Sequence, residues 1–195
     1  SNCPNIVAGN PSDYSFWGRM STPQEDYATY LFRIAREIDP NGYHMYNDYE
    51  ISYPVTSGKS KAVYDFVSGL ASRGYIDGVG FQMHRQLMSD ASFDNYKSGF
   101  ASALRSYRDI GVDVWLTELD IRIDDQTLAA DPDALDRQGR QYRDIINICL
   151  GNSNCRGVTL WGFTDGYSWI NGFQNERAAL PIAKTYNPAT RRIAP

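Results

Sequence analysis

The chain has 195 residues and a formal net charge of -4, long enough for one domain with a substantial core or for part of a larger one. Hydrophobic residues make up 42% and charged residues 22%, a mixture typical of globular rather than disordered proteins. No apolar run approaches the roughly 18 residues of a membrane span, and the lack of basic clusters argues against nucleic acid and membranes as partners.

The first predicted element is a helix. Thr22-Pro23-Gln24-Glu25 has the pattern of an N-cap, a proline at the first helical position and a capping-box glutamate. Asp39-Pro40-Asn41-Gly42 ends the segment. Between them, apolar residues recur with helical spacing at Tyr27, Tyr30, Leu31, Ile34, Ala35 and Ile38.

Four short strands are predicted next, with an amphipathic helix between successive strands, as βα units require. The strands cover residues 43–47, 76–82, 112–118 and 157–161. The helices end near Gly74, Gly111 and Gly151, and the last of them begins at Asp131-Pro132 and buries an apolar face. That face comprises Leu135, Tyr142, Ile145 and Ile146. Because a complete (β/α)8 barrel takes about 250 residues, the chain is predicted to form half a barrel or a small open sheet.

Polar or aromatic side chains follow each predicted strand. They are Asn47-Asp48, then Gln82 and His84, then Glu118 and Asp120, then Trp161 and Asp165. Each has an ordinary explanation as a turn, loop or core residue when taken alone. In a barrel, however, the carboxyl ends of the strands meet at one mouth, where enzymes of this fold carry out their chemistry. Four such strand ends in succession favour a shared site.

These residue types suit one reaction, the hydrolysis of a glycosidic bond with retention. It needs an ionised carboxylate as nucleophile and a protonated carboxyl about 5 Å away as acid/base. Glu118, at the end of the apolar run VDVWLTELDI, is the candidate nucleophile, and His84 and Asp120 would keep it oriented and ionised. Trp161 and Trp169 would provide aromatic faces for sugar rings.

Four motifs resemble consecutive signatures of glycoside hydrolase family 10, the retaining endo-β-1,4-xylanases. They are YNDYE (46–50), DGVGFQMH (77–84), WLTELDI (115–121) and GVTLWGFTDGYSW (157–169). NPSDYSFW (10–17), AREIDP (35–40) and LPIAKTYNP (180–188) extend the similarity over nearly the whole chain. The resemblance implies a TIM (β/α)8 barrel of which this chain supplies roughly strands 5–8. Residues 1–195 would form the C-terminal half of one catalytic domain, without its N-terminal half.

The resemblance also implies roles for single residues. Glu118 would be the nucleophile, with His84 and Asp120 as its partners. Asn47 and Gln82 would lie near the sugar or the carboxylates, and Trp161 and Trp169 would line the glycone subsites. The implied substrate is xylan or a xylo-oligosaccharide, cleaved by double displacement. No cofactor and no metal are implied, and the implied protein partner is the N-terminal half of the barrel, from the same precursor or a separate chain.

The cysteines bear on the cellular setting. Cys149 and Cys155 bracket a short polar turn, and the residues alone leave open a small disulfide or two buried thiols. The resemblance favours the disulfide, because some secreted family members carry one before the eighth strand. It therefore favours a secreted, periplasmic or cell-surface protein.

The acid/base is the part that the resemblance does not find in this chain. In the family it belongs to an Asn-Glu pair after the fourth strand. Asn175-Glu176 follows the last strand instead, and we predict an exposed loop acid there. Glu50 stands where Asn is usual and Arg85 where an apolar residue is common, so both bear on subsite preference.

Two other functions are alternatives for this sequence. The first is a non-catalytic xylan-binding fragment or remnant that keeps the tryptophans. The second is a metal-dependent α/β hydrolase, disfavoured because His44 and His84 are the only histidines and no spaced ligand set occurs. The acidic residues Asp124, Asp125, Asp131 and Asp133 lack EF-hand spacing and indicate the start of a helix. An open half-barrel would expose two strand edges and an apolar sheet face, so it should associate with its other half or aggregate.

Overall fold

The computed structural model describes residues 26–172 and 176–181. In chain order the helices are α1 (Tyr27–Ile38), α2 (Gly58–Ala71), α3 (Asp90–Asp109), α4 (Asp125–Ala130) and α5 (Ala134–Leu150). The strands are β1 (Met45–Asp48), β2 (Gly78–Phe81), β3 (His84–Gln86), β4 (Asp113–Asp124), β5 (Cys155–Leu160) and β6 (Glu176–Arg177). Two 3-10 helices, η3 (Asp165–Tyr167) and η4 (Trp169–Gly172), follow β5.

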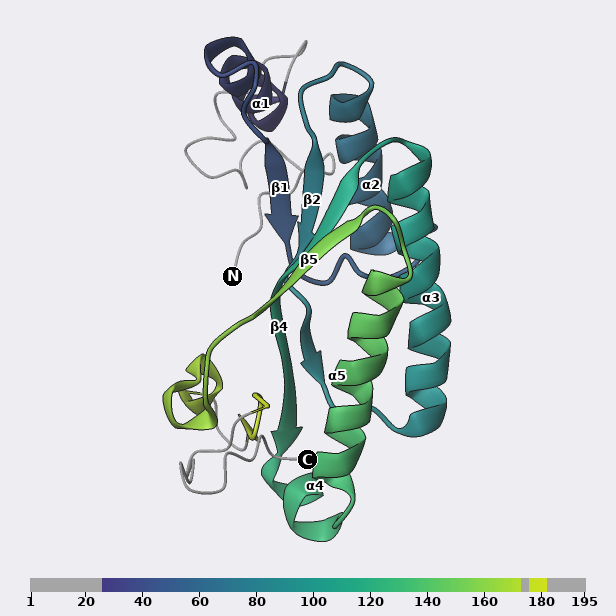
Figure 1. Cartoon of the computed structure of the whole chain (residues 1–195), viewed down its shortest axis with the longest axis vertical. Coiled ribbons are helices and arrows are strands. Elements are labelled where there is room, and N and C mark those ends of the chain that lie inside the picture. Colours follow the sequence, from purple (N-terminus) through teal and green to yellow (C-terminus); the bar gives the residue numbers. More distant parts are fainter. Residues whose placement is uncertain (1–25, 173–175, 182–195) are drawn as a thin grey trace.

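The sheet is parallel and follows the chain order. β1 pairs with β2, β2 with β4, and β4 with β5, all in parallel, so β1 and β5 are its edges in the described part of the chain. The long helices α2, α3 and α5 all lie on one side of this sheet (Figure 1). A parallel sheet with helices on one side only is the arrangement of a partial α/β barrel.

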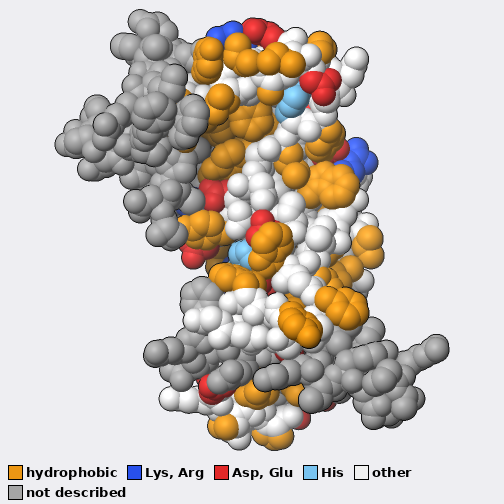
Figure 2. All heavy atoms as spheres, turned by 90° about the vertical axis from the view of Figure 1, so that its left-hand side faces the viewer, with side chains coloured by type: hydrophobic (Ala, Val, Ile, Leu, Met, Phe, Trp, Pro, Cys, Tyr) orange, Lys and Arg blue, Asp and Glu red, His pale blue; other side chains and the backbone are white. Residues whose placement is uncertain are grey.

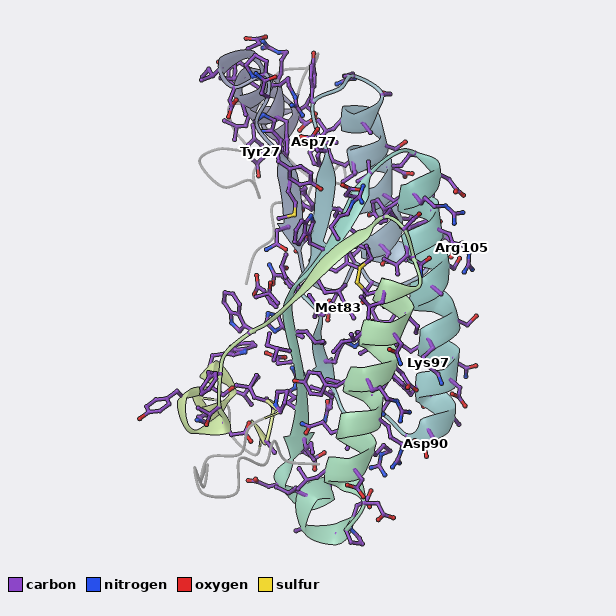
Figure 3. All side chains as sticks on the ribbon, viewed as in Figure 1. Tyr27, Asp77, Met83, Asp90, Lys97 and Arg105 are labelled. Atoms are coloured by element: carbon purple, nitrogen blue, oxygen red, sulfur yellow. A yellow bond between two sulfur atoms is a disulfide. The ribbon has the colours of Figure 1, made fainter. Side chains whose placement is uncertain are left out.

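The core lies between the sheet and these helices. Alternate residues of the central strands face the helices and are fully buried, among them Val79, Phe81, Val114 and Leu116. Helix α3 presents Phe93, Tyr96, Phe100, Ala103, Leu104 and Tyr107 to them, as its apolar spacing predicts. Lys97 lies at the edge of this face, where its ammonium is 5.4 Å from the centre of the Phe93 ring and forms an ion pair with Asp144 of α5 at 3.6 Å (Figure 3). Gly111 follows α3 with a φ of 74°, a conformation that ends helices and favours glycine.

Helix α1 departs from the prediction in its start and its burial. It begins at Tyr27 with Asp26 as N-cap, and the predicted cap Thr22 lies outside the described residues. Its apolar stripe is largely exposed, with Ile38 79% accessible, and α1 lies beyond the start of the edge strand β1 (Figure 1).

Strand β4 is longer than predicted, and the elements that follow it therefore also differ from the prediction. It continues six residues past Glu118, to Asp124, by pairing with β3 and β6. The unpredicted helix α4 follows at once, with Asp124 as its N-cap accepting from the Thr127 amide. Helix α5 therefore begins at Ala134, later than the predicted Asp131.

The face of α5 that meets the core also differs from the prediction. Leu135 is only partly buried, whereas Gln138 and Gln141 are buried beside Tyr142 and Ile145. The end of α5 is tied to the start of β5 by a disulfide between Cys149 and Cys155, which agrees with the predicted pairing. No helix in the described ranges is long and apolar enough to cross a membrane.

None of the long helices in the described part of the chain covers the other side of the sheet. Figure 2 looks onto this side and shows hydrophobic side chains along it, with acidic and histidine side chains among them. Tyr43 is 52% accessible there, and the indole of Trp115 donates to its hydroxyl at 3.2 Å. The rings lie close over glycines: an added Cβ would come within 2.5 Å of the Tyr43 hydroxyl at Gly78 and within 2.6 Å of the Trp115 ring at Gly157.

Candidate active site

A bend between two short strands aims His84 at the carboxylates. β2 ends at Phe81, and β3 begins at His84, where the chain pairs again with β4 in the register His84↔Asp120. Met83, labelled in Figure 3, is 3% accessible and has a φ of 36°, a left-handed conformation uncommon outside glycine. Strain of this kind persists only where surrounding contacts fix it.

Glu118, His84 and Asp120 form one hydrogen-bonded group. His84 Nε2 lies 3.0 Å from Glu118 Oε2, and His84 Nδ1 lies 2.9 Å from Asp120 Oδ2. Asp120 is fully buried and Glu118 is 9% accessible. A neutral imidazole has one N–H and donates to only one of the two carboxylates, whereas the imidazolium donates to both.

The charge of His84 follows from these contacts. Burial acts to lower the pKa of the ring, but the hydrogen bond and charge of Asp120, followed by those of Glu118, outweigh it. The net result is a raised pKa, which favours the imidazolium. In that form the ring can donate to Glu118 and to Asp120 at the same time.

The second support of Glu118 comes from β1. Asn47 Nδ2 donates to Glu118 Oε1 at 3.1 Å. The Thr117 hydroxyl donates to Asn47 Oδ1 at 2.7 Å and so orients the amide with its nitrogen toward Glu118. The sequence analysis did not identify Thr117, although its position one residue before Glu118 was the available signal.

Trp169 and Trp161 bring aromatic rings to the same group. Trp169 Nε1 donates to Asp120 Oδ2 at 2.8 Å, and its ring centre lies 4.9 Å from that of His84. Trp161 meets His84 edge to face at 6.2 Å. Both indoles are more than 40% accessible, which leaves faces open for a ligand. Gln82 lies at the bend, where its backbone amide donates to Asp48 O at 3.0 Å.

The structure corrects the expectation that each acid lies at the end of its strand. Glu118 and Asp120 lie inside β4, where a shift of register between Leu116 and Leu119 interrupts the pairing with β5. Asp165 does not join the group and instead accepts from the Leu180 amide at 2.8 Å. Asn175 lies outside the described residues, and the backbone of Glu176 pairs with Asp124, six residues beyond Glu118, or about 20 Å along the strand.

Within residues 26–172 and 176–181, no group of three or more His, Cys, Asp or Glu residues has a geometry that could hold a metal ion. The acidic residues around α4 have other partners. Asp124 caps α4, and Asp131 forms an ion pair with Arg137 at 2.6 Å.

A partly buried carboxylate hydrogen-bonded to an amide and an imidazole lies beside accessible indoles on a parallel α/β sheet, a type of sheet on which barrel enzymes carry their active sites. The model of glycosyl hydrolase family 10 matches residues 8–193. The chain therefore belongs to glycosyl hydrolase family 10, and the resemblance and fold class inferred from the sequence are confirmed.

Individual relatives are similar over most of this chain. Endo-1,4-beta-xylanase B of Thermotoga neapolitana is 36% identical over 177 residues, which cover 89% of this chain and 48% of that protein. Endo-1,4-beta-xylanase 1 of Humicola insolens is 37% identical, over 83% of this chain and 36% of that protein. Xylanase 10B of Thermotoga petrophila RKU-1, solved in complex with xylobiose, superposes with a TM-score of 0.75 at 31% identity, over 94% of this chain and 54% of that one. The chain thus spans about half the length of the relatives that it matches, or less.

Proposed function

We propose that this chain is the nucleophile-bearing half of a retaining endo-β-1,4-xylanase, with residues 1–195 corresponding to strands 5–8 of the barrel. The observation that carries the proposal is the double support of Glu118, by Asn47 on one oxygen and His84 on the other. A carboxylate held in this way is fixed in orientation, as a glycosidase nucleophile must be.

The proposed reaction has two steps. In the first, a Glu118 oxygen bonds to the anomeric carbon of a xylosyl unit, and the bond to the leaving oxygen breaks while an acid supplies its proton. In the second, water attacks the same carbon, gives a proton to the residue that acted as acid, and releases Glu118. Trp161 and Trp169 would stack against the sugar on the glycone side, and Gln82 would contact the sugar or the carboxylates.

The acid/base would come from the N-terminal half of the barrel. A retaining mechanism requires it about 5 Å from the nucleophile, which the distant pairing of Glu176 does not allow. The edge strands β1 and β5 are where the strands of that half would pair to complete the barrel. The Cys149–Cys155 disulfide supports an oxidising and hence extracytoplasmic setting.

A covalent trapping experiment on the complete barrel tests the nucleophile directly. A 2-deoxy-2-fluoro-xylobioside with an activated leaving group needs no proton from the acid/base, so its reaction reports the nucleophile alone. We expect one fluoro-xylobiosyl adduct, found by peptide mass spectrometry on the segment that contains Glu118. Glu118→Gln should show no adduct while still binding xylobiose.

The same sample separates the competing function. Intact and native mass measurement, followed by a xylan hydrolysis assay, shows whether a second polypeptide accompanies the chain and whether xylan is cut. Binding of xylobiose without an adduct and without hydrolysis would support the non-catalytic xylan-binding fragment. An adduct on a residue other than Glu118 would overturn the assignment of the nucleophile.

A further inference from the structure

Helix α5 buries polar side chains where a barrel helix usually buries apolar ones. Gln138, Gln141 and Tyr142 are 5%, 2% and 6% accessible. Burying an amide is unfavourable unless its hydrogen bonds are made, so such residues indicate a specific task. Gln141 makes two, because its Nε2 donates to Met88 O at 2.8 Å and its Oε1 accepts from Met88 N at 3.3 Å.

Gln138 and Tyr142, one turn apart, join two segments that lie behind the candidate site. The Tyr142 hydroxyl donates to Ala179 O at 2.6 Å and accepts from Ile121 N at 3.1 Å. Gln138 Nε2 donates to Ile121 O at 2.6 Å and also to Ala178 O. Burial, followed by the negative charge of Asp120, raises the pKa of Tyr142, so its hydroxyl keeps the proton that it donates.

These contacts are part of a closed series of contacts that leads back to the candidate site. Leu180, next to Ala179, donates its amide to Asp165 Oδ1 at 2.8 Å. Asp165 begins the loop of η3 and η4, in which its carbonyl accepts from Asn171 at 2.7 Å. That loop carries Trp169, whose indole donates to Asp120. Since Asp120 and Ile121 are neighbours in β4, the closed series of contacts starts and ends on the same strand.

The backbone is strained at the residue where Gln138 binds this closed series of contacts. Ala178 has a φ of 46°, a left-handed conformation that an L residue rarely adopts and that costs about 1 kcal/mol or more. Its carbonyl is one of the two that Gln138 binds. A strained residue held by a buried side chain is expected where the position of the segment matters.

We propose that Tyr142 and Gln138 are positioning residues. Through Ala179, Leu180 and Asp165 they fix the position of Trp169. Trp169 in turn fixes the positions of Asp120 and His84 behind Glu118. The inference rests on the proposed function, because it assigns the pair a part in orienting the nucleophile. Neither residue touches the substrate. Their effect is on geometry, and a displacement of about 1 Å at a reacting group can cost 10²-fold in rate.

The test compares two buried tyrosines that differ in whether the hydroxyl is used. Tyr142→Phe removes a hydroxyl with two partners, whereas Tyr107→Phe removes a buried hydroxyl that has no hydrogen-bond partner among the described residues. Gln138→Met removes both amide donors at similar length. The variants are made in the complete barrel, with the tryptophans labelled with ¹⁵N. The Trp169 indole resonance, assigned by its loss in Trp169→Phe, reports the bond to Asp120.

We expect Tyr142→Phe to shift the Trp169 indole resonance, and Tyr142→Phe/Gln138→Met to shift it further. On xylan, kcat should fall about 10-fold or more in the double variant, with KM changed less than about twofold. Tyr107→Phe should change neither quantity. An unchanged resonance and kcat in the double variant, even with a lower Tm, would overturn the inference, because the pair would then serve stability alone.

Two further outcomes remain decisive. If the double variant does not fold, the Trp169 indole resonance and kcat are measured on each single variant. Those results then decide between a positioning role and a role in stability alone. If the wild-type barrel does not hydrolyse xylan, the proposed function fails, while the indole resonance still shows whether Tyr142 and Gln138 set Trp169.

Discussion

The two oxygens of Glu118 are held by donors of different kinds, and each donor is itself fixed. Asn47 donates to one oxygen and is oriented by Thr117, and His84 lies within hydrogen-bond distance of the other oxygen and of Asp120. The second set of contacts gives the first its geometry, because an amide or an imidazole free to turn would lose its hydrogen bond to the carboxylate part of the time.

Thr117 is the simplest residue with which to test this support. Thr117→Val keeps the shape of the side chain and removes the hydroxyl, so the Asn47 amide can turn away from Glu118. We expect kcat/KM on xylo-oligosaccharides to fall about 10-fold, the equivalent of about 1.4 kcal/mol for one hydrogen bond. Thr117→Ser keeps the hydroxyl and should stay close to wild type. Equal losses in both variants would contradict the role of the hydroxyl.

His84 should make stability depend on pH. Its pKa is raised in the folded protein, so folding favours the protonated ring. The resulting stabilisation is fully present below the unfolded pKa of 6.5 and is lost as pH rises through the higher folded value. We expect the free energy of unfolding of wild type to exceed that of His84→Gln most between about pH 5.5 and 6.5, and less at higher pH. Urea unfolding over a pH series measures the difference, and a difference independent of pH would refute the prediction.

Among the elements, β3 is the one whose position decides the site, and Arg85 ties it to its surroundings. The guanidinium lies over the rings of Tyr96 and Tyr53, at 4.3 Å and 5.0 Å, and donates to the Tyr53 hydroxyl at 2.7 Å. Arg85 is 8% accessible and has no carboxylate partner in the described ranges, and its buried Nε has no acceptor there. A buried cation without a counter-charge is unfavourable, and the two aromatic rings offset only part of that cost.

Two Arg85 variants should differ in stability in the order opposite to chemical similarity: we expect the methionine variant to be more stable than the lysine variant. Arg85→Met removes the desolvation penalty together with the ring contacts, so we expect a change within about 1 kcal/mol. Arg85→Lys keeps a buried charge and loses the planar stacking, so we expect a loss of about 1–3 kcal/mol. Thermal or urea unfolding compares them. A larger loss in the methionine variant would indicate that the guanidinium is paired with an anion.

At the scale of the whole molecule, α2, α3 and α5 cover one face of the sheet, and no long helix of the described residues covers the other face (Figures 1 and 2). Tyr43, Met45, Leu160 and Trp161 are among the large hydrophobic side chains with more than a third of their surface accessible. Parallel sheets are almost always covered on both faces, because their strands are apolar on both sides.

This second face predicts how the chain behaves without the proposed N-terminal half. Alone, the chain should bind a hydrophobic dye and elute as oligomers or aggregate, since exposed strand edges and apolar surface promote association. Co-expression with an N-terminal half of a family 10 barrel should give a one-to-one complex with less dye binding, measured by native mass and fluorescence. A monodisperse chain that binds no dye would contradict this expectation.

Several features could be read from the sequence because they depend on local patterns. The apolar spacing of α3 and its end at Gly111, the order of strands and helices, and the residues around Glu118 all follow from short motifs. The length of β4 could not be read in this way. It is a strand beyond Glu118 because β3 and β6 pair with it there, and those partners lie far away in sequence.

The sequence by itself determined which side chains are available, namely a carboxylate, an imidazole, an amide and two indoles following successive strands. Only the tertiary structure decided which of them meet: that Thr117 orients Asn47, that Trp169 binds Asp120, and that Gln138 and Tyr142 tie the strand behind them. The reason is physical. A hydrogen bond between distant residues depends on distances set by the packing of whole elements, and no local pattern in the chain encodes those distances.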